Sequence, residues 1–183
     1  MPGQMNVVLE SQPISMYSAQ NPLIKGVYVW SGANFAGVVA ANNFATLFNP
    51  VGSGKLISFG GAFVSMVTGA AASATAPMRG LRITAHSGGS LAGAASYGKF
   101  DSNYPTSIAE VRTGNPTITA GSFLWNTPPA VTTGAGGGQF IHTVNVPPGV
   151  GPFTLREGEG VAVQTSVGDT DQVWNISFAW AEI

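Results

Sequence analysis

The stretch Asp171–Ile183, read as DQVWNISFAWAEI, decides the fold of this chain. From residue 173 onward, large apolar residues alternate with small or polar ones, and the large set is Trp174, Ile176, Phe178 and Trp180. A period of two is typical of a β-strand with one buried face. These side chains form a large apolar surface that earlier parts of the chain must cover. We therefore expect a core strand here, central in its sheet.

The rest of the chain consists of short apolar runs separated by Gly and Pro turns. We expect strands at residues 27–30, 44–48, 56–68, 79–85, 117–125, 139–146, 153–156 and 161–167. Within the fourth of these, Leu81, Ile83 and Ala85 are expected to face the core, and Arg82 and Thr84 to face solvent. No long amphipathic helix is present, and the pattern is typical of a sandwich or a barrel. Of the two, we expect an all-β fold of two packed antiparallel sheets.

The domain organisation follows from where this pattern begins. Residues 1–25 are expected to form an extended N-terminal arm, because three prolines interrupt its short apolar runs. Residues 26–183 are expected to form one β-sandwich domain. Residues 86–115 are rich in Gly, Ser and Asn, and are read as an irregular segment too long for a simple connection. Long loops usually carry function or form interfaces.

Charge is scarce in this sequence. Only 8% of its 183 residues are charged, while 44% are apolar, and soluble domains usually carry about 25% charged residues. A surface with so little charge is easily desolvated, so we expect much of it to lie against other protein. The few basic residues are scattered and the net charge is −1, which argues against nucleic-acid binding.

Several other classes are disfavoured by what the sequence lacks. It has no Cys, which excludes disulfides and thiolate metal sites. Its first residues, MPGQMNVVLE, lack the basic and apolar regions of a signal peptide. No apolar run reaches about 18 residues, so no membrane-spanning helix is expected.

A glycine-rich turn at Gly52–Lys55, GSGK, is similar to part of a phosphate-binding loop. That motif also needs Gly at position 49 and Ser or Thr at position 56, where this chain has Asn49 and Leu56. The segment enters a predicted strand, whereas a phosphate loop opens a helix. We interpret it as a turn.

Acidic residues form two close pairs. Asp169 and Asp171 could contribute to a calcium site, but such a site wants six or more oxygens, and Asp is also common in hairpin turns. Glu157 and Glu159 could act as a glycosidase pair, since residues two apart on a strand lie about 7 Å apart. Flanking glycines make an exposed turn the simpler interpretation of this second pair.

The remaining polar and aromatic candidates also have structural interpretations. His86 and His142 are the only histidines, and neither has a catalytic partner near it in sequence. Asn175 begins an N-I-S glycosylation pattern, which lies inside the predicted core strand. Three aromatic residues in the irregular segment could line a sugar-binding groove or anchor that segment to the sandwich or a neighbouring subunit. They are Tyr97, Phe100 and Tyr104.

Three segments together carry a family resemblance. They are LFNPVGSGK at residues 47–55, FTLREGEGVAV at residues 153–163, and the closing strand at residues 174–183. In these turns and in the final W-x-E, the chain resembles the jelly-roll capsid decoration, or cement, proteins of tailed bacteriophages. The resemblance lies in turn signatures and covers about the last three quarters of the chain.

The resemblance implies a jelly-roll sandwich and a non-enzymatic role. A protein of this family would stand as a homotrimer on the outer capsid surface of the virion, having been made in the host cytoplasm. It would bridge subunits of the major capsid protein, with no cofactor, no catalytic residue, no nucleic acid and no membrane. The alternative is a carbohydrate- or receptor-binding module of a phage tail or fibre. A glycan-active enzyme is a third class, but its candidate acids and bases are poorly placed.

Overall fold

The structure is a computed structural model that describes residues 24–37, 42–68, 77–126, 141–145, 153–165 and 172–183. Its strands are β1 (Gly26–Ala36), β2 (Asn43–Asn49), β3 (Ile57–Thr68), β4 (Met78–Ser87), β5 (Ser90–Leu91), β6 (Gly98–Lys99), β7 (Glu110–Thr113), β8 (Thr117–Asn126), β9 (Ile141–Asn145), β10 (Phe153–Leu155), β11 (Glu159–Thr165) and β12 (Val173–Glu182). A single 3-10 turn, Ala94–Ser96, is the only helical element in these ranges. The predicted arm at residues 1–25 falls almost wholly outside them.

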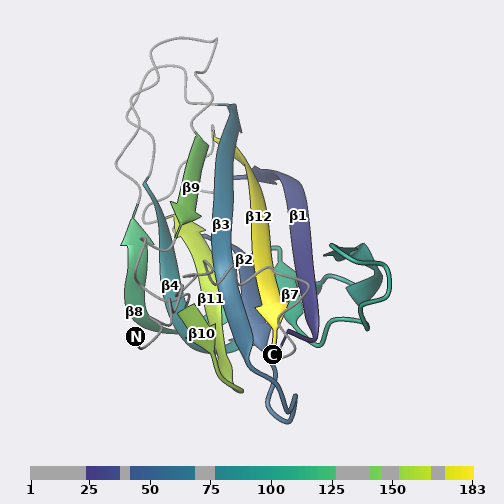
Figure 1. Ribbon diagram of the computed structural model, residues 1–183. Coiled ribbons are helices and arrows are strands. Elements are labelled where there is room, and N and C mark those ends of the chain that lie inside the picture. Colours follow the sequence, from purple (N-terminus) through teal and green to yellow (C-terminus); the bar gives the residue numbers. More distant parts are fainter. Residues whose placement is uncertain (1–23, 38–41, 69–76, 127–140, 146–152, 166–171) are drawn as a thin grey trace, which may run out of the picture.

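Two antiparallel sheets form a β-sandwich, as the alternation predicts. Sheet A has the order β10-β3-β12-β1-β6, with β9 also paired to β3, and sheet B has the order β5-β7-β2-β11-β4-β8. Figure 1 shows β3, β12 and β1 side by side, with strands of sheet B behind them. The C-terminal strand β12 lies between β3 and β1, so its predicted central place is confirmed.

The topology is that of a jelly roll. The first half of the chain pairs with the second half as in one long hairpin: β1 pairs with β12, β2 with β11, β3 with β10, and β4 with β8. Within each arm of this hairpin the longer strands alternate between the sheets, because the hairpin is wrapped around the core; β4 and β8, at its closed end, both lie in sheet B. Double-sheet jelly rolls are built in this way.

The core between the sheets is aromatic. All four large residues of β12 are buried, with Trp174 1% exposed and the other three fully enclosed. The Phe178 ring stacks on Trp30 of β1 at 5.8 Å and meets the Phe59 ring of β3 edge-on at 6.1 Å. Such contacts add to the hydrophobic burial. The residues that define the final strand thus form the centre of the molecule.

One prediction about β4 is wrong. Leu81 pairs with Ala162, whose neighbours along β11 point into the main core. Leu81, Ile83 and Ala162 therefore lie on the opposite face of sheet B, where they form a second apolar cluster with Phe48. Arg82 points the other way, and its guanidinium reaches the Thr154 carbonyl of sheet A at the edge of the sandwich. The alternation was correct, but a pattern of period two does not reveal which face meets the main core when both faces of a strand carry buried side chains: Met78 lies in the main core, and Leu81 and Ile83 lie in the second cluster.

The segment between β4 and β8 is more regular than expected. Its short strand β7 adds to sheet B beside β2, and β6 adds to sheet A beside β1. Part of the segment stands beyond β1, at the right of Figure 1. It lacks the long apolar runs that make strands visible in a sequence, because each of its strands is only two to four residues long.

Candidate functional site

The three segments that carry the resemblance meet at one end of the sandwich. The Glu157 carboxylate accepts hydrogen bonds from the N–H groups of Gly52 (3.0 Å) and Gly54 (2.7 Å). Both glycines have positive φ, at 82° and 67°. The backbone of the GSGK turn therefore does form an anion-binding concavity, but the anion is the protein's own carboxylate. This supports the turn interpretation over a phosphate site.

Glu159 is also engaged. Its Oε2 accepts from Arg82 (2.6 Å) and from the Arg156 N–H (2.8 Å). Burial works to raise the pKa of this carboxyl, but the bonds from Arg156 and Arg82 outweigh it and hold the pKa below its ordinary value. A glycosidase needs one carboxyl with a raised pKa as general acid. The pKa of Glu159 moves the opposite way, and both carboxylates are engaged in hydrogen bonds that hold the turn.

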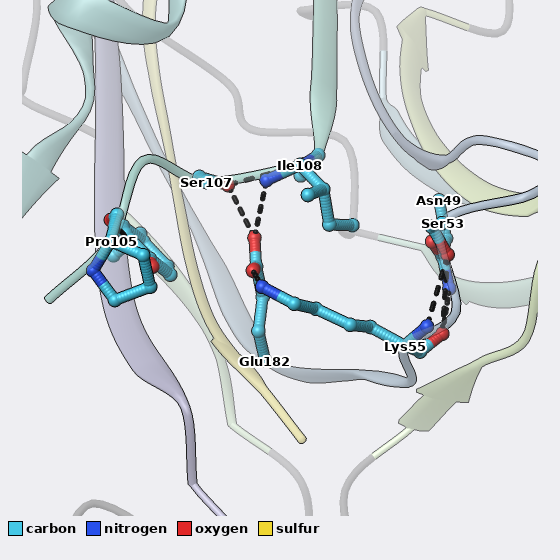
Figure 2. Close-up of polar contacts among 9 residues, drawn as sticks. Asn49, Ser53, Lys55, Pro105, Ser107, Ile108 and Glu182 are labelled. Carbon is cyan, nitrogen blue, oxygen red and sulfur yellow. Dashed lines mark hydrogen bonds and ion pairs between the residues drawn. The ribbon is translucent and has the colours of Figure 1, made fainter.

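Glu182, the penultimate residue, is the centre of a buried polar cluster (Figure 2). Its side chain is fully buried and pairs through Oε2 with Lys55 Nζ at 2.7 Å. Its Oε1 accepts from Ser107 Oγ at 2.6 Å and from the Ile108 N–H at 2.9 Å. Both oxygens are thus satisfied, as a buried charge requires. The cluster joins the β2–β3 turn and the segment before β7 to the last strand.

Tyr28 of β1 completes this attachment. Its hydroxyl donates to the Pro105 carbonyl at 2.9 Å. Burial, helped by the charge of Glu182, raises the pKa of Tyr28 to about 12. The phenol therefore stays protonated and keeps this hydrogen bond at any physiological pH. These contacts are structural, and they leave no group free for acid–base chemistry.

A second polar group has the geometry of a catalytic triad. His86 Nδ1 lies 2.9 Å from Thr46 Oγ1, and His86 Nε2 lies 3.0 Å from a carboxylate oxygen of Glu110. Burial lowers the pKa of His86, so the ring is neutral at pH 7, and Nε2 must carry the proton because a carboxylate only accepts. Thr46 is fully buried, however, so no substrate can reach its hydroxyl. These residues come from β2, β4 and β7, and nothing in the sequence indicated that they would meet.

The aromatic residues of the segment between β4 and β8 anchor it to the sandwich. Tyr97 is 6% exposed and meets the Trp180 ring edge-on at 5.4 Å. Tyr104 lies against Tyr28 at 6.4 Å. Only Phe100 is open to solvent, at 69% exposure. Of the two interpretations of these residues, the anchoring one is therefore favoured for the two tyrosines.

The charged residues are distributed unequally between the two sheets. The six strands of sheet A contain only two charged residues, Lys99 and the buried Glu182. Sheet B contains Arg79, Arg82, Glu110, Arg112 and Glu159. The shortage of charged residues is therefore greatest in sheet A, whose outer surface is nearly neutral.

We call this surface the neutral face. It is the outward side of β1, β12 and β3, and its members are Val29, Ser31, Phe63, Ser65, Val67, Val173, Asn175, Ser177 and Ala179. Phe63 is 39% exposed and Val67 48% exposed. Two polar members, Ser31 and Ser177, share a hydrogen bond between their Oγ atoms at 2.8 Å, and Asn175 Oδ1 accepts from the backbone N–H of Asn34, just beyond the face, at 3.0 Å. Burying this surface should therefore carry only a small desolvation penalty, and it is our candidate interface.

Within the described residues no group of three or more His, Cys, Asp and Glu is placed to hold a metal ion, and Asp169 and Asp171 lie outside those ranges. No helix in the described part of the chain is long and apolar enough to cross a membrane. A scan against protein-family models and searches of curated proteins and solved structures found no match. Function must therefore be argued from the residues.

Proposed function

We propose that this protein is a non-enzymatic structural protein of a bacteriophage virion. It acts as a capsid decoration, or cement, protein: a homotrimer that binds the outer face of the major capsid protein lattice and stabilises it. The turn signatures at residues 47–55 and 153–163 support this proposal through the family resemblance, and the jelly-roll strand order agrees with it.

The neutral face is the observation that carries the proposal. Interfaces between proteins are depleted in charged residues at their centre. On this face, Phe63 and Val67 supply apolar area, the Ser31 and Ser177 hydroxyls are paired with each other, and Asn175 Oδ1 accepts from the backbone N–H of Asn34. Covering the face would therefore leave few unpaired polar groups and no unpaired charge. Such a surface suits a broad contact with a capsid subunit and needs no pocket.

Stabilisation would follow from mass action. A ligand that binds the assembled lattice but not the separate subunits favours the lattice by its binding free energy. No bond is made or broken, which agrees with a buried Thr46 and with carboxylates that are fully engaged in structure. Particles that carry the protein should withstand more heat and osmotic stress than bare particles.

The direct test is cosedimentation of the purified protein with empty capsids of the virus that encodes it. Phe63→Glu, on the neutral face, should weaken binding at least tenfold. Phe123→Glu is the matched control, because Phe123 is 65% exposed on β8 of the other sheet. Equal binding by both variants would exclude the neutral face as the interface. Absence of capsid binding by the wild type would overturn the proposal and favour a receptor-binding module of a tail or fibre.

The trimer can be tested separately by analytical ultracentrifugation at micromolar concentration, in solution and after elution from particles. A threefold mass supports the proposal. A monomer under both conditions would contradict the trimeric part while leaving the capsid contact open to the cosedimentation test.

A further inference from the structure

Strand β8 forms an open margin of sheet B. It pairs with β4 and with no other described strand, and Figure 1 shows it at the left side of the sandwich. It spans ten residues, whereas the other strands that end the two sheet orders, β5, β6 and β10, have two or three. In an antiparallel edge strand, about half of the backbone N–H and C=O groups point away from the partner strand. β8 therefore presents the longest edge among these end strands.

The sequence of β8 gives this edge little protection. Natural edge strands are usually blocked by charged side chains, by proline or by a covering segment. β8 reads TITAGSFLWN and contains no charged residue and no proline. Seven of its ten residues are exposed, so the strand is accessible along most of its length. Its pairing with β4 shifts register three times, which increases the local twist but leaves the edge exposed.

The strand is also held firmly enough to act as a template. Leu124 and Trp125 pack against the main core, and Ile118 packs against the second apolar cluster. The Trp125 ring lies so close over Gly80 that a β-carbon there would collide with it. An incoming segment does not have to order β8 when it binds, which lowers the entropy lost on association.

The segment that fits this edge is the N-terminal arm of another copy. Residues 1–23 lie outside the described residues, and Glu10 is the only charged side chain among them. Their two short apolar runs, at residues 6–9 and 14–17, contain Val, Ile and Tyr, which favour strands. Fully extended, such an arm reaches about 75 Å, at roughly 3.3 Å per residue. It can therefore leave one molecule and still pair along β8 of the next, which is about 34 Å long.

The positions of the arm and the edge favour pairing between copies. The arm joins the sandwich at β1, where the Lys25 N–H donates to the Glu182 carbonyl at 2.7 Å. Figure 1 shows β1 and β8 on opposite sides of the sandwich. A donor segment on one side and an acceptor edge on the other give a head-to-tail contact, and such contacts form closed rings when the rotation between copies allows it.

We propose that the N-terminal arm of one copy adds as a strand to the open edge of β8 in the next copy, and that three such contacts close the trimer. The partner at this surface is thus a second copy of this chain, bound through main-chain hydrogen bonds along β8. The inference rests on the trimer of the proposed function. It does not rest on the capsid contact, which uses the neutral face.

Lysines on the edge test β8 as the acceptor. The double variant Thr119→Lys, Ser122→Lys places two charges at exposed positions of β8, where an added strand would desolvate them. The control, Thr106→Lys, Ser102→Lys, makes the same changes at exposed residues outside any strand. Both should keep the wild-type far-UV circular dichroism, and sedimentation should show the trimer of the β8 variant alone dissociating at a protein concentration at least tenfold higher. Equal dissociation of the two variants would overturn pairing at β8, while leaving the trimer and the capsid contact intact.

A single acidic residue on the sheet face should behave differently from these lysines. Phe123→Glu, the control in the capsid test, should leave the trimer intact. The Arg79 guanidinium lies over the Phe123 ring at 5.2 Å and would neutralise the new carboxylate. Dissociation of this variant to the same extent as the β8 lysine variant would contradict the proposed geometry of the edge.

Cross-linking tests the arm as the occupant. The chain has no cysteine, so the single variants Val8→Cys and Ser122→Cys can be co-expressed and joined by a flexible bismaleimide. Any product between positions 8 and 122 then joins two copies, and we expect it in clear excess over the product of Val8→Cys with Ser102→Cys. Equal yields, or a link that forms only within a chain carrying both cysteines, would overturn the proposal. A wild-type monomer would overturn this inference and the trimer together.

Discussion

Lys55 and Glu182 form an ion pair at 2.7 Å in which the carboxylate is fully buried while the lysine side chain is 23% exposed. The pair joins the turn between β2 and β3 to the last strand, β12. Glu182 also holds Ser107 and Ile108. One buried carboxylate thus ties two distant chain segments to the last strand and closes this end of the sandwich.

Removing that carboxylate should be strongly destabilising. We expect Glu182→Ala to lower the free energy of unfolding by about 3–5 kcal/mol, the usual effect of breaking a buried charge pair. Denaturant unfolding followed by Trp fluorescence measures this change. Lys25→Met removes an exposed lysine near the same strand end and is the control, with an expected change within about 0.5 kcal/mol. Similar midpoints for both variants would contradict the role of Glu182.

Truncating a core aromatic side chain should also lower the stability of the protein strongly. Phe178→Ala should lower stability by about 3–5 kcal/mol, because it opens a cavity between Trp30 and Phe59. Phe123→Ala removes a ring that is 65% exposed and should change stability far less. Thermal melts monitored by near-UV circular dichroism compare the two. Phe178→Ala melting with the wild type would mean that the strand is inside out.

Gly160 is required for close packing on the outer side of sheet B. A β-carbon there would collide with the Leu47 carbonyl and the Phe48 ring. Gly160→Ala should therefore cost about 1–3 kcal/mol, as overpacking does. At Gly93 a β-carbon meets nothing within 4 Å and φ is −66°. Gly93→Ala should be neutral or stabilise the protein by up to about 1 kcal/mol. The melting temperature of Gly160→Ala should therefore lie below that of Gly93→Ala, and the reverse order would refute the prediction.

His86 predicts a dependence of stability on pH. Burial lowers its folded-state pKa below the ordinary value of 6.5, so the unfolded state binds more protons just below that pH. Its contribution to stability is complete above pH 6.5 and is lost as the pH falls toward the folded-state pKa. The melting temperature should fall between about pH 7 and pH 5, and His86→Gln should reduce that slope. His142→Gln measures the share of the other histidine; an unchanged slope in His86→Gln would disprove the assignment.

We expect the N-terminal arm to contribute to assembly but not to folding of the sandwich. All described strands begin at Gly26 or later, so deletion of residues 1–20 should leave the sandwich folded. Extended segments with short apolar runs can add to a sheet edge or groove of a neighbour. The truncated protein should therefore keep its far-UV circular dichroism but bind capsids, or hold its trimer, more weakly. Loss of the β-sheet spectrum, or unchanged assembly, would contradict this prediction.

Much of the fold could be predicted because its information is local. The alternation around Phe178 identified a buried strand, and its apolar bulk indicated a central position. The pairing of β3 with β12 shifts register at Gly60-Gly61, and a glycine within a strand is itself a local signal of a bulge. The turn at residues 49–55 was recognisable because Pro and Gly restrict or extend backbone freedom wherever they occur.

The sequence by itself determined the fold class and the position of the core strand, because a repeat of two residues and turn-forming residues act over a few positions. Only the tertiary structure decided that Leu81 faces away from the main core, and that Lys55 meets Glu182 from 127 residues away. It also decided that the side-chain oxygen of Asn42 would be buried without a hydrogen-bond partner in the described part of the chain. These relationships depend on which strands become neighbours when the long hairpin wraps, and that choice is made by packing of the whole core, which no short stretch of sequence encodes.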